Sequence, residues 1–139
     1  MGFSTHSRAR LKILLDTHVW LWLLGEPEQF TSEGLARLRS GDTQLFLSAA
    51  STWEIAIKHA LGKLRLPSDD IEYVRARLRQ TPAQSLPIQH EHALRIARLP
   101  RHHRDPFDRM LIAQAQVEGL AIMTDDRMFP AYDVTVVGV

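Results

Sequence analysis

The sequence has no cysteine among its 139 residues. This absence excludes disulfide bonds, iron–sulfur clusters, zinc fingers and thiol nucleophiles. Long hydrophobic runs are also missing: the chain has no stretch of about 18 apolar residues, so we expect no membrane-spanning helix. The N-terminus lacks the apolar core of a signal peptide. These absences predict a cytoplasmic protein with no membrane association.

Sequence motifs of several common enzyme classes are absent as well. The chain contains no P-loop, no GxGxxG fingerprint and no serine nucleophile elbow. Its 45% hydrophobic and 24% charged residues are ordinary for a globular protein. A chain of this length buries roughly two-thirds of the surface that it exposes when unfolded, so we expect one domain over residues 11–139. Residues 1–10 show no periodicity, and we interpret them as a disordered or vector-derived extension.

The net charge of +1 conceals an uneven distribution of charge along the chain. Residues 1–57 contain five basic and six acidic residues, residues 58–109 contain eleven and six, and residues 110–139 contain one and four. The middle segment is therefore basic and its two flanks are acidic. A basic segment can attract a polyanion, although a solvated helix face gives the same count.

Hydrophobic patterns predict strands that alternate with helices. Apolar runs predict strands over residues 12–16, 45–47, 120–124 and 134–137, with a brief extended piece at 86–88. Caps and helical spacing predict helices that begin at Thr31 or Ser32, at Ser48, at Pro67 or Ser68, near residue 93 and at Pro106. Residues 17–24 fit either a longer first strand or a helix. The alternation indicates an α/β domain with a largely parallel sheet.

One predicted helix carries both an apolar stripe and a carboxylate with apolar neighbours. The helix runs from Ser48 to about Leu61 and ends at Gly62, where a left-handed residue is favoured. A surface helix turns its apolar stripe toward the core. The members of this stripe are Trp53, Ala56, Ile57, Ala60 and Leu61. Glu54 lies among these residues.

Acidic residues fall at the ends of the predicted elements. Asp16 closes the first strand, and Asp125 and Asp126 follow the strand over 120–124. Asp105 and Asp108 lie in the first turn of the helix that begins at Pro106. Because ligands of open α/β sheets bind outside the carboxyl ends of the strands, Asp16 and the Asp125/Asp126 pair are expected to share one rim.

Each acid also has an explanation that involves no function. Glu54 can pair with Lys58, four residues on, in the favourable orientation. Asp105 can cap a helix, and Asp108 can complement the helix dipole. Asp125 and Asp126 can belong to a polar turn.

Convergence of the acids would require a cation. Two carboxylates ~5 Å apart repel by about 3 kcal/mol at an effective dielectric constant of 20. Four carboxylates form six such pairs, and the unrelieved cost would exceed the stability of a domain, about 5–15 kcal/mol. Oxygen ligands without cysteine favour Mg²⁺ or Mn²⁺ over zinc. Such a cation suits phosphoryl chemistry because it activates water and neutralises developing charge.

Four long motifs carry a family resemblance: LLDTHVWLW (14–22), LSAASTWEIAIKHALGKL (47–64), HRDPFDRMLIAQA (103–115) and IMTDD (122–126). With them, residues 12–137 resemble the PIN-domain ribonucleases of the VapC toxin type. The resemblance implies an α/β/α sandwich with a central, mainly parallel sheet. It also implies an endoribonuclease that uses Mg²⁺ or Mn²⁺, forms a homodimer and is inhibited by a cognate antitoxin.

The resemblance assigns the same four acids to catalysis and to metal binding: Asp16, Glu54, Asp108 and Asp126. The motif T-x-D selects Asp126, but the doubled acid leaves Asp125 as an alternative. A supporting role beside these acids falls to Asp105, Thr17, Ser48 and Thr124. The three hydroxyls could hold a carboxylate or a water molecule, or simply satisfy strand ends.

Further roles remain open. His18 could act as a base, but it would point away from Asp16 if the first strand continued. Contacts to the RNA backbone are predicted, as an alternative to surface ion pairs, for Lys58, Lys63, Arg65, Arg104 and Arg109. The competing functions are a non-catalytic RNA- or protein-binding module of the same fold, and a metal-dependent phosphatase or DNA nuclease.

Overall fold

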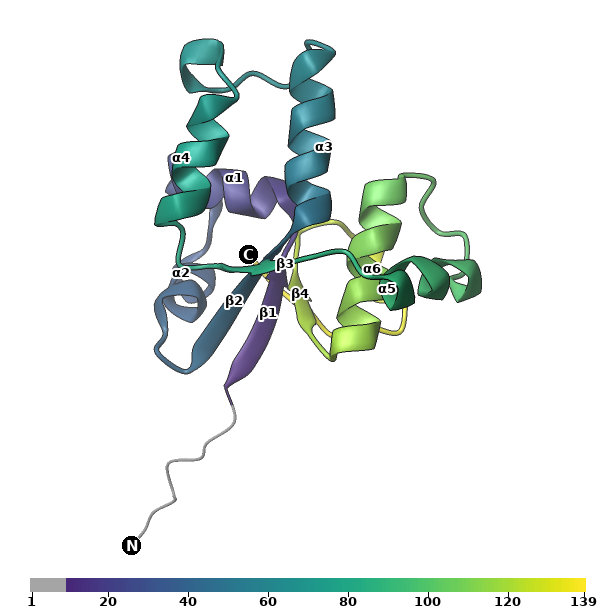
Figure 1. Ribbon diagram of the computed structural model, residues 1–139. Coiled ribbons are helices and arrows are strands. Elements are labelled where there is room, and N and C mark those ends of the chain that lie inside the picture. The colour runs from purple at the N-terminus through teal and green to yellow at the C-terminus, as the bar shows by residue number, and fades with distance from the viewer. Residues whose placement is uncertain (1–9) are drawn as a thin grey trace, which may run out of the picture.

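The computed structural model describes residues 10–139. Of the predicted N-terminal extension, only Arg10 lies within this range. The described residues form one parallel sheet in the order β3-β2-β1-β4-β5 (Figure 1). Its strands are β1 (Leu11–Leu15), β2 (Thr43–Ser48), β3 (Gln84–Leu86), β4 (Ala121–Met123) and β5 (Val136–Val137).

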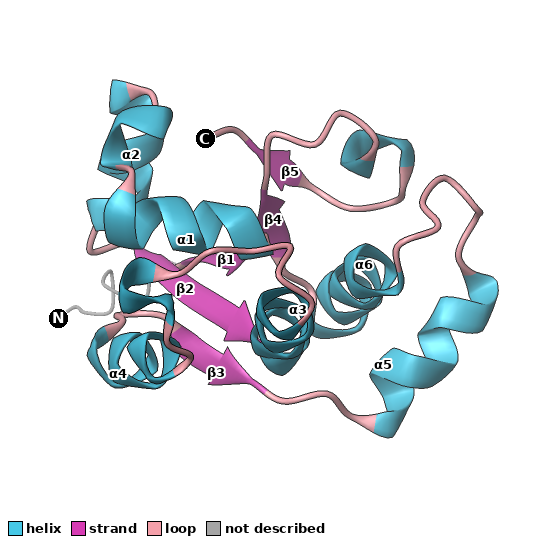
Figure 2. Ribbon diagram, turned by 90° about the horizontal axis from the view of Figure 1, so that it is seen from above, coloured by secondary structure: helices cyan, strands magenta, loops and turns pink. Residues whose placement is uncertain are grey.

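Helices connect the strands and cover both faces of the sheet. They are α1 (Thr17–Gly25), α2 (Ser32–Arg39), α3 (Ala49–Ala60), α4 (Glu72–Gln80), α5 (His90–Arg95) and α6 (Pro106–Glu118). Figure 2 shows α1, α2 and α4 on one side of the sheet and α5 and α6 on the other. The predicted α/β/α sandwich with a parallel sheet is confirmed. Among the described residues, no helix is long and apolar enough to cross a membrane.

The central strand divides its side chains between two hydrophobic clusters. Leu14 packs in the cluster of α6, whereas Ile13 and Leu15 pack with residues of α1, α2 and α4. All three side chains are fully buried. Alternate side chains of a strand point to opposite faces, so the apolar run Ile13-Leu14-Leu15 suits a strand that is covered on both sides.

The apolar segment that follows β1 is a helix. Asp16 has extended backbone angles and its side chain accepts a hydrogen bond from the Thr17 amide, which caps α1. This cap ends the strand and begins the helix, and it settles the choice that the sequence left open. Val19 and Trp20 of α1 are buried in the core.

Two predictions about secondary structure were wrong. The extended piece at 86–88 is in fact a fifth strand, β3, over residues 84–86 at the edge of the sheet. It was missed because Gln84 and Ser85 are polar and exposed. The helix expected at Pro67 begins only at Glu72, because residues 67–69 form a 3₁₀ turn in which Ser68 has a φ of 60°.

The orientation predicted for α3 was also wrong. Its buried residues are Ala50, Ser51, Glu54 and Ile55, whereas Trp53 is 53% exposed and the rest of the predicted apolar stripe is exposed too. Figure 1 shows the reason: α3 stands on the end of the sheet and rises beyond it, so that only its first turns contact the core. The helix therefore turns a carboxylate toward the molecule.

The order of the strands determines where a ligand can bind. β1 pairs with β2 on one side and with β4 on the other. The direction of the crossovers reverses at such a strand, and open α/β sheets bind ligands beyond the carboxyl ends of the strands at this point. Asp16 follows β1 there, and Thr124 follows β4.

Candidate active site

The carboxyl end of the sheet contains an acidic pocket of about 240 Å³. Its walls come from the first residues after β1, from α3, from the start of α6 and from the loop after β4. All four acids predicted as ligands line it: Asp16, Glu54, Asp108 and Asp126. Two of the predicted supporting residues, Thr17 and Asp105, line it as well. Lys58 is the one lysine or arginine among the described lining residues.

Asp16 is buried at the base of the pocket, where it is 3% exposed. Its Oδ1 accepts the Thr17 amide at 2.7 Å, and its Oδ2 accepts the Thr124 hydroxyl, also at 2.7 Å. Burial raises the pKa of Asp16, and the charge of Glu54 adds to this effect, although His18 and the two hydrogen bonds lower the pKa. The hydrogen bonds thus fix the orientation of the carboxylate, and burial makes its ionised form less favourable than in water.

Glu54 pairs with Lys58 and also lines the acidic pocket. It is 7% exposed, and it forms an ion pair with Lys58 one helical turn further on. Its Oε1 also accepts the Thr17 hydroxyl at 2.7 Å, and this hydroxyl lies 2.9 Å from that of Ser51. The pair therefore lies inside the acidic pocket. The hydrogen bond and the charge of Glu54 raise the pKa of Lys58, which stays protonated.

Of the pocket acids, Asp108 has a carboxylate that receives no hydrogen bond from the described residues. Asp105 caps α6 by accepting the amides of Phe107 and Asp108 at 2.8 and 3.3 Å. No hydrogen bond or close ion pair reaches the Asp108 carboxylate from residues 10–139. Burial, followed by the charges of Asp105, Asp16, Glu54 and Asp126, raises the pKa of Asp108 to about 8. A cation at this position would relieve the repulsion.

The doubled acid after β4 separates into one residue inside the pocket and one outside. Asp126 lines the pocket, its amide donates to Thr124 at 3.0 Å and its Oδ1 accepts the Met128 amide at 2.9 Å. Asp125 is exposed, and its Oδ1 lies 2.6 Å from Nε2 of His18. The sequence analysis expected His18 to point away from Asp16 if the first strand continued. The strand ends and α1 starts at Thr17, so His18 faces Asp16, with Nδ1 lying 3.5 Å from its Oδ2.

This geometry predicts unequal effects at the two adjacent acids. Asp126→Asn should weaken both Mn²⁺ affinity and RNA cleavage by more than tenfold, because it removes a charge of the pocket that lies close to Asp108. Asp125→Asn should change either quantity by less than about threefold, since a solvent-exposed pair with histidine contributes little. The check is Mn²⁺ titration and cleavage kinetics of both variants. Equal losses, or a larger loss at Asp125, would reverse the assignment.

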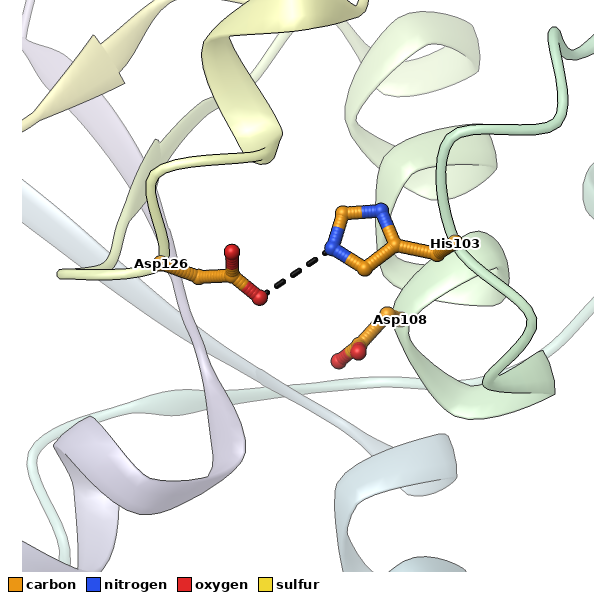
Figure 3. A group of neighbouring side chains, drawn as sticks. All are labelled: His103, Asp108 and Asp126. Atoms are coloured by element: carbon orange, nitrogen blue, oxygen red, sulfur yellow. Dashed lines mark hydrogen bonds and ion pairs between the residues drawn. The ribbon is translucent and has the colours of Figure 1, made fainter.

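His103 is a neighbour of two pocket acids, and the sequence analysis missed it. It is 9% exposed, and its Nε2 lies 3.1 Å from Oδ2 of Asp126 (Figure 3). One ligand atom from each of His103, Asp108 and Asp126 lies within 4.8 Å of the others. The available signal was its position at the start of HRDPFDRMLIAQA, the motif that contains two of the acids.

The other predicted residues have different surroundings. Ser48 is buried and caps α3 by accepting the Ala50 amide at 2.9 Å. The Arg109 guanidinium donates to the carbonyls of Ile96, Leu99 and Pro100, so it fixes the chain before α6. Three of the predicted RNA-binding side chains are exposed: Lys63, Arg65 and Arg104.

The donor set fits a hard divalent cation. Five carboxylates surround the pocket with one lysine, and their oxygens come from four separate chain segments that the fold holds together. Mg²⁺ and Mn²⁺ prefer carboxylate and water oxygens as ligands. Such a site can bind a cation that in turn binds phosphate oxygens.

Comparison with protein families gives one match over most of the chain. The model of the PIN domain matches residues 13–134. Ribonuclease VapC16 of Mycobacterium tuberculosis (strain ATCC 25618 / H37Rv) is 46% identical over 48 residues, which are 34% of this chain and 34% of that protein. The match thus spans about a third of the relative's length.

Solved structures share the fold over almost the whole chain. VapBC2 from Rickettsia felis, bound to a DNA fragment from its promoter, has a TM-score of 0.69 at 10% identity and covers 92% of this chain and 98% of its own. DNA-bound VapBC from Salmonella typhimurium has a TM-score of 0.64 at 17% identity, with the same coverage. FitAcB from Neisseria gonorrhoeae has a TM-score of 0.55 at 23% identity and covers 89% and 95%.

Proposed function

The chain belongs to the PIN domain family, and from this premise we propose that it is a Mg²⁺- or Mn²⁺-dependent endoribonuclease of the toxin type. One observation carries the proposal: Asp16, Glu54, Asp108 and Asp126 converge in one pocket although they are far apart in the sequence. A binding module would have no use for carboxylates that repel one another, whereas a site that holds a cation needs them.

The roles of the residues follow from their surroundings. Asp16, Glu54, Asp108 and Asp126 would hold one or two divalent cations. When bound, such a cation lowers the pKa of a water molecule and neutralises charge on the phosphoryl oxygens. Thr17 and Thr124 hold the carboxylates of Glu54 and Asp16 in place, and Asp105 fixes the start of α6 below Asp108.

Lys58 and the exposed basic residues are suited to hold the RNA backbone. Lys58 places a positive charge at the edge of the acidic pocket, where a scissile phosphate would lie. Arg65 lines a second pocket, and the two pockets share His18, Leu21 and Leu64. We propose that the strand runs across this pair of pockets, with Lys63 and Arg104 as further phosphate contacts. We do not assign Arg109 to RNA binding, because its guanidinium already donates hydrogen bonds to backbone carbonyls.

An antitoxin is the proposed protein partner. The solved structures with this fold include the VapBC complexes and a toxin–antitoxin complex from Klebsiella pneumoniae, at 19% identity and a TM-score of 0.59. Co-expression with the protein encoded beside this chain, followed by co-purification, tests this part of the proposal. Homodimer formation and a cytoplasmic location stay predictions, and sedimentation of the purified protein tests the first.

Substrate competition distinguishes a ribonuclease from the alternative phosphoryl enzymes. The purified protein with Mn²⁺ is incubated in separate reactions with a single-stranded RNA, with the DNA of the same sequence and with p-nitrophenyl phosphate. The proposal predicts internal cuts in the RNA alone. Cleavage of the DNA at an equal rate, or release of nitrophenol, would assign the pocket to a DNA nuclease or to a phosphatase.

Thermal melts separate a metal ligand from a helical ion pair at Glu54. At a Mn²⁺ concentration of 100 Kd, binding stabilises a protein by about 2.7 kcal/mol. Glu54→Gln should remove about half of this increment, since a tenfold loss of affinity is worth about 1.4 kcal/mol. Lys58→Ala should keep or enlarge it, because the lysine competes with the cation for the same carboxylate. An increment that Glu54→Gln leaves unchanged would reduce Glu54 to a partner of Lys58.

A further inference from the structure

A buried chain of hydrogen bonds leads from Tyr132 through His103 to Asp126. Asp126 Oδ2 lies 3.1 Å from His103 Nε2, and His103 Nδ1 lies 3.1 Å from the Tyr132 hydroxyl. The same hydroxyl accepts the His103 backbone amide at 2.8 Å. We propose that His103 is a positioning residue, which Tyr132 orients and which holds the Asp126 carboxylate toward the metal site.

The contacts of Tyr132 determine which ring nitrogen of His103 carries the proton. The Tyr132 oxygen already accepts the His103 amide, so its own hydrogen is free to be donated. Nδ1 of His103 lies within reach as the acceptor of that hydrogen. In a neutral imidazole the proton is then on Nε2, where it is donated to Asp126. This arrangement satisfies every polar atom of the chain.

Packing fixes the imidazole ring in the same orientation. The ring of His103 lies stacked on that of Tyr132, with centroids 5.4 Å apart and 19° between the planes. Phe129 contacts it edge-on, with centroids 5.0 Å apart. Both neighbours are buried, so the ring has little freedom to rotate. A rigid donor can select one rotamer of the carboxylate beside it.

The effect on Asp126 is to fix both of its oxygens. Oδ1 accepts the Met128 amide and Oδ2 accepts His103, and each oxygen retains a lone pair for a cation. Figure 3 shows the Asp126 carboxylate beside the imidazole and the Asp108 carboxylate below it. Groups that orient the ligands of a metal typically contribute 10–100-fold to affinity or activity. The role inferred for His103 rests on the metal site of the proposed function.

Mn²⁺ titration followed by electron paramagnetic resonance tests this role without RNA. His103→Ala should raise the Kd for Mn²⁺ about tenfold or more. His103→Gln, whose amide can donate from nearly the position of Nε2, should restore at least half of the loss on a logarithmic scale. Tyr132→Phe touches no carboxylate, and it should give an intermediate Kd because Nε2 is no longer forced to carry the proton. His102→Ala is the matched control, since His102 is exposed and its ring contacts that of Tyr132 edge-on from outside the hydrogen-bonded chain. Melting curves check that each variant is folded at the temperature of the titration.

The outcomes separate this inference from the proposed function. A wild-type protein that binds no Mn²⁺ overturns the metal site, and the role of His103 with it. A wild type that binds Mn²⁺ while His103→Ala binds it equally well overturns the inference alone. Nitrogen coupling in the pulsed spectrum of bound Mn²⁺, lost in His103→Ala, would make His103 a ligand and would also overturn the positioning role. A graded series with no such coupling supports it.

Discussion

Replacing Asp16 by asparagine is expected to abolish RNA cleavage while the protein stays folded. Asp16 is the most deeply buried of the four acids, and its carboxylate accepts hydrogen bonds from the first residue of α1 and from the residue that follows β4. Changes beyond the ligands of a metal cost about 10–100-fold. Loss of a ligand's charge should therefore cost more than a hundredfold, which leaves no cleavage detectable in a standard assay.

The fold should tolerate this substitution. The amide oxygen of asparagine can accept the Thr17 amide as Oδ1 does now, so the cap of α1 persists. The amide nitrogen would face the Thr124 hydroxyl, which can accept a hydrogen bond. Because burial raises the pKa of Asp16, a neutral side chain also removes a desolvation cost. Circular dichroism and a melting temperature equal to or above that of the wild type check this expectation.

A matched substitution at the opposite end of the sheet provides the control. Asp133 is exposed and lines a pocket together with Leu11, at the end where β1 begins. Asp133→Asn changes the net charge by the same amount as Asp16→Asn. Because Asp133 does not line the acidic pocket, this variant should cleave RNA at the wild-type rate. Cleavage by Asp16→Asn within tenfold of this control would remove Asp16 from the site.

The metal-free protein should be less stable at pH 8 than at pH 5. In the folded state the pKa of Asp108 is about 8 and that of Asp16 is raised, whereas both lie near 3.8 in the unfolded chain. Between these values the folded state binds more protons than the unfolded state. Its stability is therefore greatest below the unfolded pKa and is lost as the pH rises toward 8.

Mn²⁺ should reverse this dependence. Protons compete with the cation for the same oxygens, so the increase in melting temperature should be larger at pH 8 than at pH 5. A saturation of 100 Kd corresponds to about 2.7 kcal/mol, or roughly 10 °C for a domain of this size. Asp108→Asn should flatten the pH dependence of the metal-free protein and reduce the increment. Melting curves that do not respond to Mn²⁺ at either pH would favour a binding module without a metal.

The sequence predicted the sheet and the acids because both depend on local patterns. The run Ile13-Leu14-Leu15 is apolar at every position, and a carboxylate directly follows it. Parallel strands bring their carboxyl ends to one edge, so Asp16 and the acids after β4 could be placed together without a structure. The assignment of Glu54 and Asp108 to the same site came from the family resemblance, since spacing alone does not show that distant helices converge.

The features that the sequence did not predict depend on tertiary packing. The stripe containing Trp53 has a helical period, but a period does not specify which face of α3 meets the sheet. The exposed polar residues of β3 hide a strand that is defined only by its pairing with β2. His103 and Tyr132 are 29 residues apart, and their contact has no signature in the sequence.

Restoration of RNA cleavage by metal tests the central claim most directly. The purified protein is treated with EDTA, dialysed and assayed on single-stranded RNA while Mn²⁺ is added back in steps. The account predicts no cleavage before the addition, and a rate that rises with occupancy of the metal site and is half-maximal at the Kd measured by titration. Cleavage that persists at its full rate in EDTA, with contaminating nucleases excluded by the Asp16→Asn protein purified in parallel, would contradict it.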